Sequence, residues 1–436
     1  MSELVDGVLA GAPGEELARL PLPETFRAVY LRKEDVGMFG DEAVPDVRRS
    51  MHVGEVGFPE LAPDEVVVAV MASGINYNTA WSAMFQPVPT FTFLEHYGRQ
   101  DRWGARHDLD YQVVGSDAAG IIVRTGSAVR QWRPGDRVVV IPSTDDSAEL
   151  NPANTTKIPR AWGYETNFGG LADFTVVKMD QLLPKPNHLT WEEAAINTLC
   201  AMTAYRMLVG PHGARMKQGD IVLLWGAAGG LGSYGVQLVK NGGGIPVAVV
   251  SSDRKARLVR ELGCDVVLDR REFGDTDGAL REPKTWRRIG RAIRDAVGED
   301  PHIVFEHTGR ETFSASVFLA RSGGTVVTCG SSSGYRHEYD NRYLWMNLKS
   351  IVGSHGASPA EAAETNRLFS LGALIPALSA SHPLEEAGEA TRSVQLGEHL
   401  GKVAVRCLAP HDGLGIEDHE LRARIDEERL TLFRKL

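Results

Sequence analysis

The stretch IVLLWGAAGGLGSYGVQL, residues 221–238, decides the fold of this chain. An apolar run leads directly into a glycine-rich loop, and residues with helical apolar spacing follow. Strand, glycine loop and helix in this order are typical of a dinucleotide site, because glycine lets the backbone approach a diphosphate and the helix N-terminus offers free N–H groups. A glycine-rich connection without a ligand is the alternative. The expected cofactor contacts are Gly226, Ala228, Gly229, Gly230, Leu231 and Gly232.

Beyond the loop, apolar strand candidates alternate with amphipathic helix candidates. The strand candidates are PVAVVSS (246–252), VVLD (266–269), HIVFEHTG (302–309) and GTVVTCGS (324–331). Continuous apolar strands joined by helices predict a parallel sheet buried on both faces. We therefore expect an α/β fold in which residues 196–354 form a Rossmann-type, doubly wound parallel sheet that binds the cofactor.

The remainder of the chain is rich in short β-branched runs punctuated by Gly, Pro and Asp, such as EVVVAVMAS (65–73) and RVVVIP (137–142). One late strand is expected at GKVAVRCLA (401–409). Residues 1–195 and 355–436 are thus expected to form a second, β-rich domain. The segment 189–208 predicts one helix that begins at an N-cap, Thr190, with two glutamates in its first turn.

The tip of the second predicted strand indicates which dinucleotide binds. The acid that would hold a free ribose 2′-hydroxyl is missing there, whereas Ser251, Ser252, Arg254 and Lys255 supply hydroxyls and positive charge. These groups suit a 2′-phosphate, so NADPH is expected in preference to NADH. Asp253 is the one unfavourable charge. The alternative is that the two basic residues are only the solvated first turn of a helix.

Composition limits the class of protein. The chain has 436 residues, 43% of them apolar and 24% charged, with a formal charge of −10. An acidic balance without basic blocks disfavours nucleic-acid binding, and no run reaches the roughly 20 apolar residues of a membrane helix. The N-terminal residues lack the order of a secretion signal. Four scattered cysteines indicate a reducing compartment, so a multidomain cytoplasmic protein is expected.

The order of these parts resembles the medium-chain dehydrogenase/reductase superfamily, whose members combine a GroES-like, β-rich catalytic domain with a Rossmann domain. Zinc alcohol dehydrogenases of that superfamily carry cysteine and histidine ligands where this chain reads GINYN (74–78) and GSDAAG (115–120). No cluster of four cysteines exists for a structural zinc either. No metal is therefore expected, which favours hydride addition to a polarised alkene over alcohol chemistry.

Long strings narrow the resemblance to the crotonyl-CoA carboxylase/reductases. They are GINYNTAW (74–81), FLEHYGR (93–99), GSDAAG (115–120), WGYETNFGGLA (162–172), WGAAGGLGSYGVQL (225–238), FEHTGRETF (305–313), EYDNRYLWM (338–346) and IVGSH (351–355). This resemblance implies NADPH-dependent reductive carboxylation of a 2-enoyl-CoA to an alkylmalonyl-CoA, of the kind that supplies extender units for polyketide assembly. A plain 2-enoyl-CoA reductase and a non-catalytic cofactor-binding protein are the alternatives.

The resemblance implies a pocket for CO2 formed by Asn78, Glu165 and His355, with Tyr164 beside the glutamate. CO2 has no net charge but two electron-rich oxygens, so amide and imidazole N–H donors suit it. Glu165 is expected to order a water or to orient the other two residues. The structural alternative is that the histidine stabilises a loop and the asparagine caps backbone. Relatives more often have Phe where this chain has Tyr164.

Two departures from the family concern the substrate. Ala161 and Gly356 stand where relatives have large apolar residues, so we expect room for a medium-chain or bulky acyl group, with about 0.8 kcal/mol for each buried methylene. Refilling by neighbouring side chains is the alternative. Arg342 and Tyr343 are CoA candidates by resemblance. The basic run 287–294 after Trp286 suits either the phosphates of CoA or a solvated helix face.

The nicotinamide ring is expected between the two domains, at the carboxyl ends of the strands. His307 and Cys329 lie in two of the loops found there, and the cysteine is interpreted as a packing residue rather than a nucleophile. In this family CoA contacts are shared between subunits, which implies a homodimer or homotetramer. The expected partners are therefore small molecules and further copies of the chain, without nucleic acid or membrane.

Overall fold

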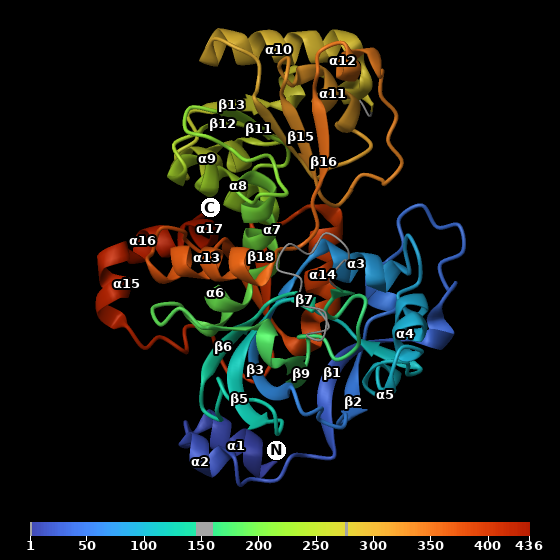
Figure 1. Ribbon diagram of the computed structural model, residues 1–436, viewed down its shortest axis with the longest axis vertical. Helices are drawn as coiled ribbons and strands as arrows, with labels where there is room; N and C mark the ends of the chain where they lie inside the picture. Colours follow the sequence, from blue (N-terminus) through green and yellow to red (C-terminus); the bar gives the residue numbers. More distant parts are fainter. Residues whose placement is uncertain (1, 145–159, 275–277) are drawn as a thin grey trace. The chain divides into compact units, whose positions relative to one another are not determined.

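The computed structural model describes residues 2–144, 160–274 and 278–436 (Figure 1). These residues form two compact units. The β-rich unit comprises Met1–Leu199 and Leu378–Thr431, and the parallel-sheet unit comprises Cys200–Ala377 and Leu432–Leu436. The expected division into two domains at 195/196 and 354/355 stays a prediction.

The parallel-sheet unit contains a six-stranded sheet in the order β13-β12-β11-β14-β15-β16, and all neighbours run parallel (Figure 1). Its strands are β11 (Ile221–Leu224), β12 (Ile245–Val250), β13 (Val266–Asp269), β14 (Ile303–Glu306), β15 (Thr325–Thr328) and β16 (Ser350–Gly353). The strand order reverses between β11 and β14, and ligands of open α/β sheets bind at such a point. The expected Rossmann-type fold class is confirmed.

Helices cover both faces of this sheet. They include α8 (Gly230–Asn241), α9 (Asp253–Glu261), α10 (Pro283–Val297) and α11 (Phe313–Leu319). Trp225, Trp286 and Phe313 belong to the core that joins β11 to α10 and α11. A Cβ added at Gly235 of α8 would lie 2.7 Å from Leu224, so α8 packs closely against the opposite face of β11. Close packing on both faces explains why these strands are apolar throughout.

The β-rich unit is built on a larger, mainly antiparallel sheet in the order β10-β6-β5-β3-β18-β17, with β9 paired to β3. Its strands are β3 (Glu65–Ile75), β5 (Ala118–Thr125), β6 (Arg137–Val140), β9 (Phe174–Lys178), β10 (Leu182–Pro184), β17 (Leu378–Pro383) and β18 (Lys402–Arg406). A smaller sheet has the order β2-β1-β4 and contains β1 (Thr25–Arg32), β2 (His52–Gly57) and β4 (Tyr111–Val113). The GroES-like class of this unit is confirmed.

Two helices of this unit bear on the site. Helix α3 (Tyr77–Met84) follows β3 directly, and α14 (Ala387–Leu396) packs against it. The predicted single helix over 189–208 is wrong: α6 (Trp191–Ala195) begins at the N-cap Thr190 with a capping box, and α7 (Thr198–Leu208) begins separately. The break occurs because Asp117 accepts hydrogen bonds from the Thr198 hydroxyl and the Leu199 N–H, which starts a new helix.

Candidate active site

Asn78 lies in the first turn of α3 and is held by a short chain of hydrogen bonds. Its Nδ2 donates to Ser116 Oγ at 2.8 Å, and Ser116 Oγ donates to the carbonyl of Trp162 at 2.6 Å. Asn78 Oδ1 is buried and has no hydrogen-bond partner among the described residues. The amide is therefore anchored on one side and retains groups that a bound molecule can engage.

Asp117, next to Ser116, is buried near the start of α3 and accepts several hydrogen bonds. Its carboxylate accepts from Asn76 Nδ2 at 2.8 Å, from Thr198 Oγ1 at 2.5 Å and from the Leu199 N–H at 2.8 Å. Lys402 Nζ lies 3.0 Å from Asp117 Oδ2, and both side chains are almost completely buried. A paired and hydrogen-bonded charge of this kind is costly to disturb, so it fixes the entry into α3.

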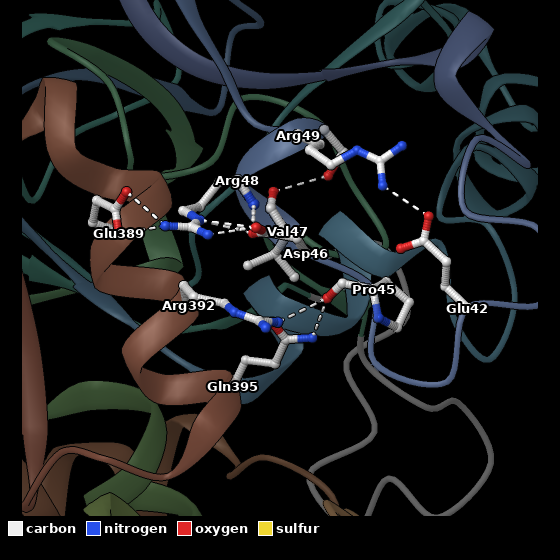
Figure 2. A network of polar contacts seen from close by, with 10 residues as sticks. Glu42, Pro45, Asp46, Val47, Arg48, Arg49, Glu389, Arg392 and Gln395 are labelled. Atoms are coloured by element: carbon white, nitrogen blue, oxygen red, sulfur yellow. Dashed lines mark hydrogen bonds and ion pairs between the residues drawn. The ribbon is translucent and has the colours of Figure 1, made fainter.

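Helix α14 packs against α3 and also binds the segment 45–49 (Figure 2). Arg392 Nη1 and Gln395 Nε2 both donate to the carbonyl of Pro45, at 3.0 and 2.8 Å. Gln395 Nε2 also lies 3.1 Å from Sδ of Met84, the last residue of α3. The helix that carries Asn78 is thus fixed at both ends.

Strand β8 (Arg160–Ala161) and the turn that follows it carry three further predicted residues, Ala161, Tyr164 and Glu165. The N–H of Ala161 donates to Glu165 Oε2 at 2.8 Å, and the N–H of Glu165 donates to the Ala161 carbonyl at 2.7 Å. Burial, with a smaller effect of Glu165, raises the pKa of Tyr164 to about 12, so its phenol is neutral. Since Trp162 lies within this turn, the chain from Asn78 through Ser116 connects α3 to it.

His355 and Gly356 follow β16 in the parallel-sheet unit. The side chain of His355 is exposed, and its carbonyl accepts from Arg206 Nη1 at 2.9 Å. Gly356 has a φ of +54°, a conformation that favours glycine. The structure thus brings Asn78, Ala161, Tyr164 and Glu165 into one unit. The participation of His355 and Gly356 in the pocket stays a prediction.

The glycine loop has the geometry of a dinucleotide site. Gly226 has a φ of +56°, and a Cβ at Gly232 would lie 2.4 Å from the Gly226 carbonyl. Gly229 is the N-cap of α8, and it has no side chain to satisfy the first N–H groups of that helix. Free N–H groups at a helix N-terminus are suited to a diphosphate, so the residues present fit a nicotinamide dinucleotide.

The predicted 2′-phosphate residues gather where β12 meets α9. Lys255 Nζ donates to Ser251 Oγ at 3.3 Å, and Ser252 caps α9 by accepting from the Lys255 N–H. Arg254 Nε donates to the backbone oxygen of Leu436 at 2.7 Å. The unfavourable Asp253 pairs with Arg271 at 2.7 Å, which offsets its charge.

His307 and Cys329 lie at the ends of β14 and β15. His307 Nε2 is 2.9 Å from the Trp225 carbonyl, and burial lowers the pKa of His307 to about 4. A neutral imidazole beside a carbonyl must donate from Nε2, which leaves Nδ1 as an acceptor. Burial raises the pKa of Cys329 to about 12, so its thiol stays protonated and is a poor nucleophile.

Glu306 anchors the loop that presents His307. It is completely buried at the end of β14 and accepts from the N–H groups of Thr308 and Gly309, at 2.8 and 2.9 Å. The hydroxyls of Thr312 and Ser316 also donate to it. Sequence reasoning missed Glu306, Ser116, Asp117 and Lys402, although all except Lys402 stand within strings that carried the family resemblance.

The predicted CoA residues lie near the outer strands of the parallel sheet. Arg342 binds Asp340 at 2.6 Å, and Tyr343 packs edge-on against Phe318 with 5.0 Å between ring centroids. In the basic run of α10, Arg288 donates to the carbonyls of residues 272 and 273, and Arg294 pairs with an aspartate. Two of the four arginines in that run, Arg288 and Arg294, therefore already bind groups of the chain itself.

Among residues 2–144, 160–274 and 278–436, no three His, Cys, Asp or Glu side chains are grouped so that they could hold a metal ion. Within the same ranges, no helix has both the length and the apolar character needed to cross a bilayer.

Two family models match the chain. The alcohol dehydrogenase GroES-like domain matches residues 62–187, and the zinc-binding dehydrogenase model matches residues 230–370. The first match falls in the β-rich unit and the second in the parallel-sheet unit. Both agree with the two folds described above.

Full-length relatives are more specific. A crotonyl-CoA reductase of Streptomyces collinus is 49% identical, with 97% of each chain covered, and a crotonyl-CoA carboxylase/reductase of Cereibacter sphaeroides is 36% identical, with 92% of each covered. The solved structure of the 2-octenoyl-CoA carboxylase reductase CinF, in complex with NADP and 2-octenoyl-CoA, is 58% identical. It covers 100% of this chain and 99% of its own, with a TM-score of 0.97. By sequence and by fold, this chain belongs to the crotonyl-CoA carboxylase/reductase family.

Proposed function

We propose that this protein is an NADPH-dependent 2-enoyl-CoA carboxylase/reductase. The observation that carries the proposal is the full-length similarity, at 58% identity, to a carboxylase reductase solved with NADP and 2-octenoyl-CoA. When bound, NADPH supplies the hydride that adds to C3 of the enoyl thioester. The electron pair of the alkene moves to C2, which forms a carbon–carbon bond to CO2 and yields an alkylmalonyl-CoA and NADP⁺. Protonation at C2 instead would make the protein a plain reductase.

The residues of the β-rich unit hold the electrophile. The free N–H of the Asn78 amide donates to an oxygen of CO2. The imidazole of His355, which belongs to the parallel-sheet unit, stays a predicted second donor. Glu165, fixed by the Ala161 N–H, orders a water or orients these donors. Tyr164 contributes a neutral phenol beside them, since burial keeps its pKa at about 12.

The choice of NADPH is supported by two groups of residues, one suited to the diphosphate and one suited to the 2′-phosphate. Free N–H groups at the start of α8 face the diphosphate, and Ser251, Arg254 and Lys255 take the 2′-phosphate. His307 and Cys329 border the nicotinamide. We expect Lys255→Ala to raise the Kd of NADPH about tenfold and that of NADH less than twofold, measured by fluorescence titration. Similar wild-type dissociation constants for the two cofactors would refute the preference.

The acyl group is medium-chain or bulky. The small Ala161 and the absent side chain of Gly356 support this, as does the 2-octenoyl-CoA bound to the relative. Arg342 and Tyr343 hold the CoA portion. We expect kcat/KM to be higher for 2-octenoyl-CoA than for crotonyl-CoA, and Gly356→Phe to reverse that order. Equal or reversed wild-type values contradict the chain-length proposal and leave the carboxylation proposal intact.

The protein is a homodimer or homotetramer located in the cytoplasm. Trp345, Met346 and Leu348 are large apolar side chains exposed just before the edge strand β16, and exposed apolar side chains of this kind are typical of an interface. Four free cysteines, three of them buried, accord with a reducing compartment. Light scattering of the purified protein tests the assembly, and a monomer at micromolar concentration contradicts it.

One experiment separates the three functional classes. NADPH oxidation by 2-octenoyl-CoA is followed with and without bicarbonate, and the thioester product is identified by mass. A carboxylated product is expected. Saturated acyl-CoA alone indicates a plain reductase, and no oxidation indicates a non-catalytic cofactor-binding protein.

A further inference from the structure

The loop 115–117 contacts α3 at two positions in its first turn. Asp117 binds the N-cap residue Asn76, and Ser116 binds Asn78, two residues further along the chain. Ser116 is 1% exposed, so its hydroxyl exchanges no hydrogen bonds with bulk solvent. The same short loop thus sets both the start of the helix and the side chain predicted to hold CO2.

The direction of the hydrogen bonds through Ser116 is fixed by chemistry. A serine hydroxyl has one proton, and the carbonyl of Trp162, 2.6 Å away, can only accept. Ser116 Oγ must therefore accept from Asn78, so the NH2 group of that amide, and not its oxygen, faces the serine at 2.8 Å. Within the described residues, this is the one hydrogen bond that the Asn78 side chain makes.

The acceptor at the far end of the chain is rigid. The backbone N–H of Trp162 donates to the Pro142 carbonyl at 2.7 Å, and its indole N–H donates to the Phe168 carbonyl at 3.0 Å. Trp162 is also completely enclosed, with 2% of its surface exposed. Ser116 thus ties the Asn78 amide to a turn that has little freedom to move.

We propose that Ser116 is a positioning residue for the carbon–carbon bond-forming step, acting through the Asn78 amide. This inference rests on the proposed function. With its NH2 group anchored on Ser116, the amide directs its second N–H toward an oxygen of CO2. Without Ser116 the amide is free to turn its own oxygen toward CO2, where two electron-rich atoms repel. The C2 carbanion equivalent then takes a proton more often, and saturated acyl-CoA accumulates.

The test is the product ratio of Ser116→Ala at fixed bicarbonate. The loss of one hydrogen bond is expected to raise the KM for CO2 about fivefold, and the saturated product rises with it. The rate of NADPH oxidation at saturating enoyl-CoA stays within about twofold, because hydride transfer does not use this amide. Ser116→Cys, whose thiol is a weaker hydrogen-bond partner of similar volume, is expected to shift the ratio in the same direction.

Ser50→Ala is the matched control. Ser50 is fully buried in the same unit, and its hydroxyl donates to the Ala83 carbonyl near the other end of α3 at 2.6 Å. This variant loses a comparable buried hydrogen bond to the same helix without touching Asn78. A lower melting temperature with an unchanged product ratio is expected. A ratio shifted as much as in Ser116→Ala overturns the proposal, because any loosening of α3 would then suffice.

A double variant completes the test. If Ser116 acts through Asn78, Ser116→Ala combined with Asn78→Ala gives the product ratio of Asn78→Ala alone. Additive shifts, or an unchanged ratio in Ser116→Ala while Asn78→Ala shifts it, overturn the positioning role only. Wild-type protein that forms no carboxylated thioester overturns the proposed function itself.

Discussion

Two glycines of the parallel-sheet unit share a backbone conformation but differ in surroundings. Gly226 has a φ of +56° and Gly219 a φ of +83°, so any other residue is strained at either position. A Cβ at Gly226 would lie 3.1 Å from Cε1 of His307, whereas a Cβ at Gly219 would meet nothing within 4 Å. Backbone strain and contact with the cofactor loop can therefore be separated experimentally.

We expect Gly226→Ala and Gly219→Ala to destabilise the protein by a similar amount, about 1 kcal/mol each. Only Gly226→Ala is expected to raise the Kd of NADPH, by about tenfold or more, because its methyl group displaces His307 and the diphosphate loop. Fluorescence titration and urea unfolding measure the two effects. Equal cofactor affinity in both variants would contradict the role assigned to the loop.

At the scale of single elements, α14 is attached to the segment 45–49 by contacts of two kinds (Figure 2). The Arg48–Glu389 pair, 3.2 Å apart, is exposed on both sides. Gln395 is half-buried and donates both to the Pro45 carbonyl and to Sδ of Met84. Exposed ion pairs contribute little, because water and salt screen them, so the half-buried amide of Gln395 contributes more to holding α3.

Gln395→Ala is expected to lower the free energy of unfolding by about 1 kcal/mol, through the loss of its hydrogen bonds. Glu389→Ala is expected to leave the urea midpoint unchanged within error. Neither variant is expected to change the KM for CO2, because neither touches the Asn78 amide or Ser116. The reverse ranking of the two variants would show that the ion pair is the anchor.

The end of β14 gives a second test at this scale. Glu306→Gln is nearly isosteric but places an NH2 group among four donors, so we expect a loss of about 2 kcal/mol in unfolding free energy and weaker NADPH binding. Glu338→Gln, the same change at an exposed position, is the control. Unchanged stability of Glu306→Gln in calorimetry would contradict the anchoring role.

At the scale of the whole molecule, buried histidines set the response to acid. Burial lowers the pKa of His107 to about 3 and that of His188 to about 4, from 6.5. Below pH 6.5 these histidines bind protons in the unfolded chain but not in the folded chain, so the free energy of unfolding falls as the pH drops toward 4. Each group contributes about 1.4 kcal/mol per pH unit in that window.

His188 offers a clean variant, since neither of its ring nitrogens has a hydrogen-bond partner among the described residues. His188→Leu is expected to keep its stability at pH 7 and to lose about 1.4 kcal/mol per pH unit less than wild type between pH 6 and 4.5. Urea unfolding at several pH values measures this slope. His96→Gln, at an exposed position, is the control and is expected to retain the wild-type slope. A wild-type slope in His188→Leu as well would contradict the role of burial.

Prediction from sequence succeeded where the signal is local. The strands of the parallel sheet and the glycine loop depend on apolar runs and on glycines within a few residues. The break between α6 and α7 was missed because it depends on Asp117, 81 positions before Thr198. The Asp117–Lys402 pair joins residues 285 positions apart, a distance over which no local pattern carries information. The role of Ser116 has no local signal either, because it depends on which neighbour receives its proton.

The pairing of β3 with β18 has a consequence during synthesis on the ribosome. Lys402 of β18 donates to the Ile75 carbonyl, 327 positions earlier in the chain. At roughly 5–20 residues per second, the ribosome takes about 15 to 65 s to make the intervening chain. Throughout that interval residues 72–75 of β3 lack β18, since β9 pairs with β3 only at residues 65–69, while Cys200–Ala377 of the parallel-sheet unit are already made and can fold first. The nascent β-rich half is therefore the part most in need of a chaperone.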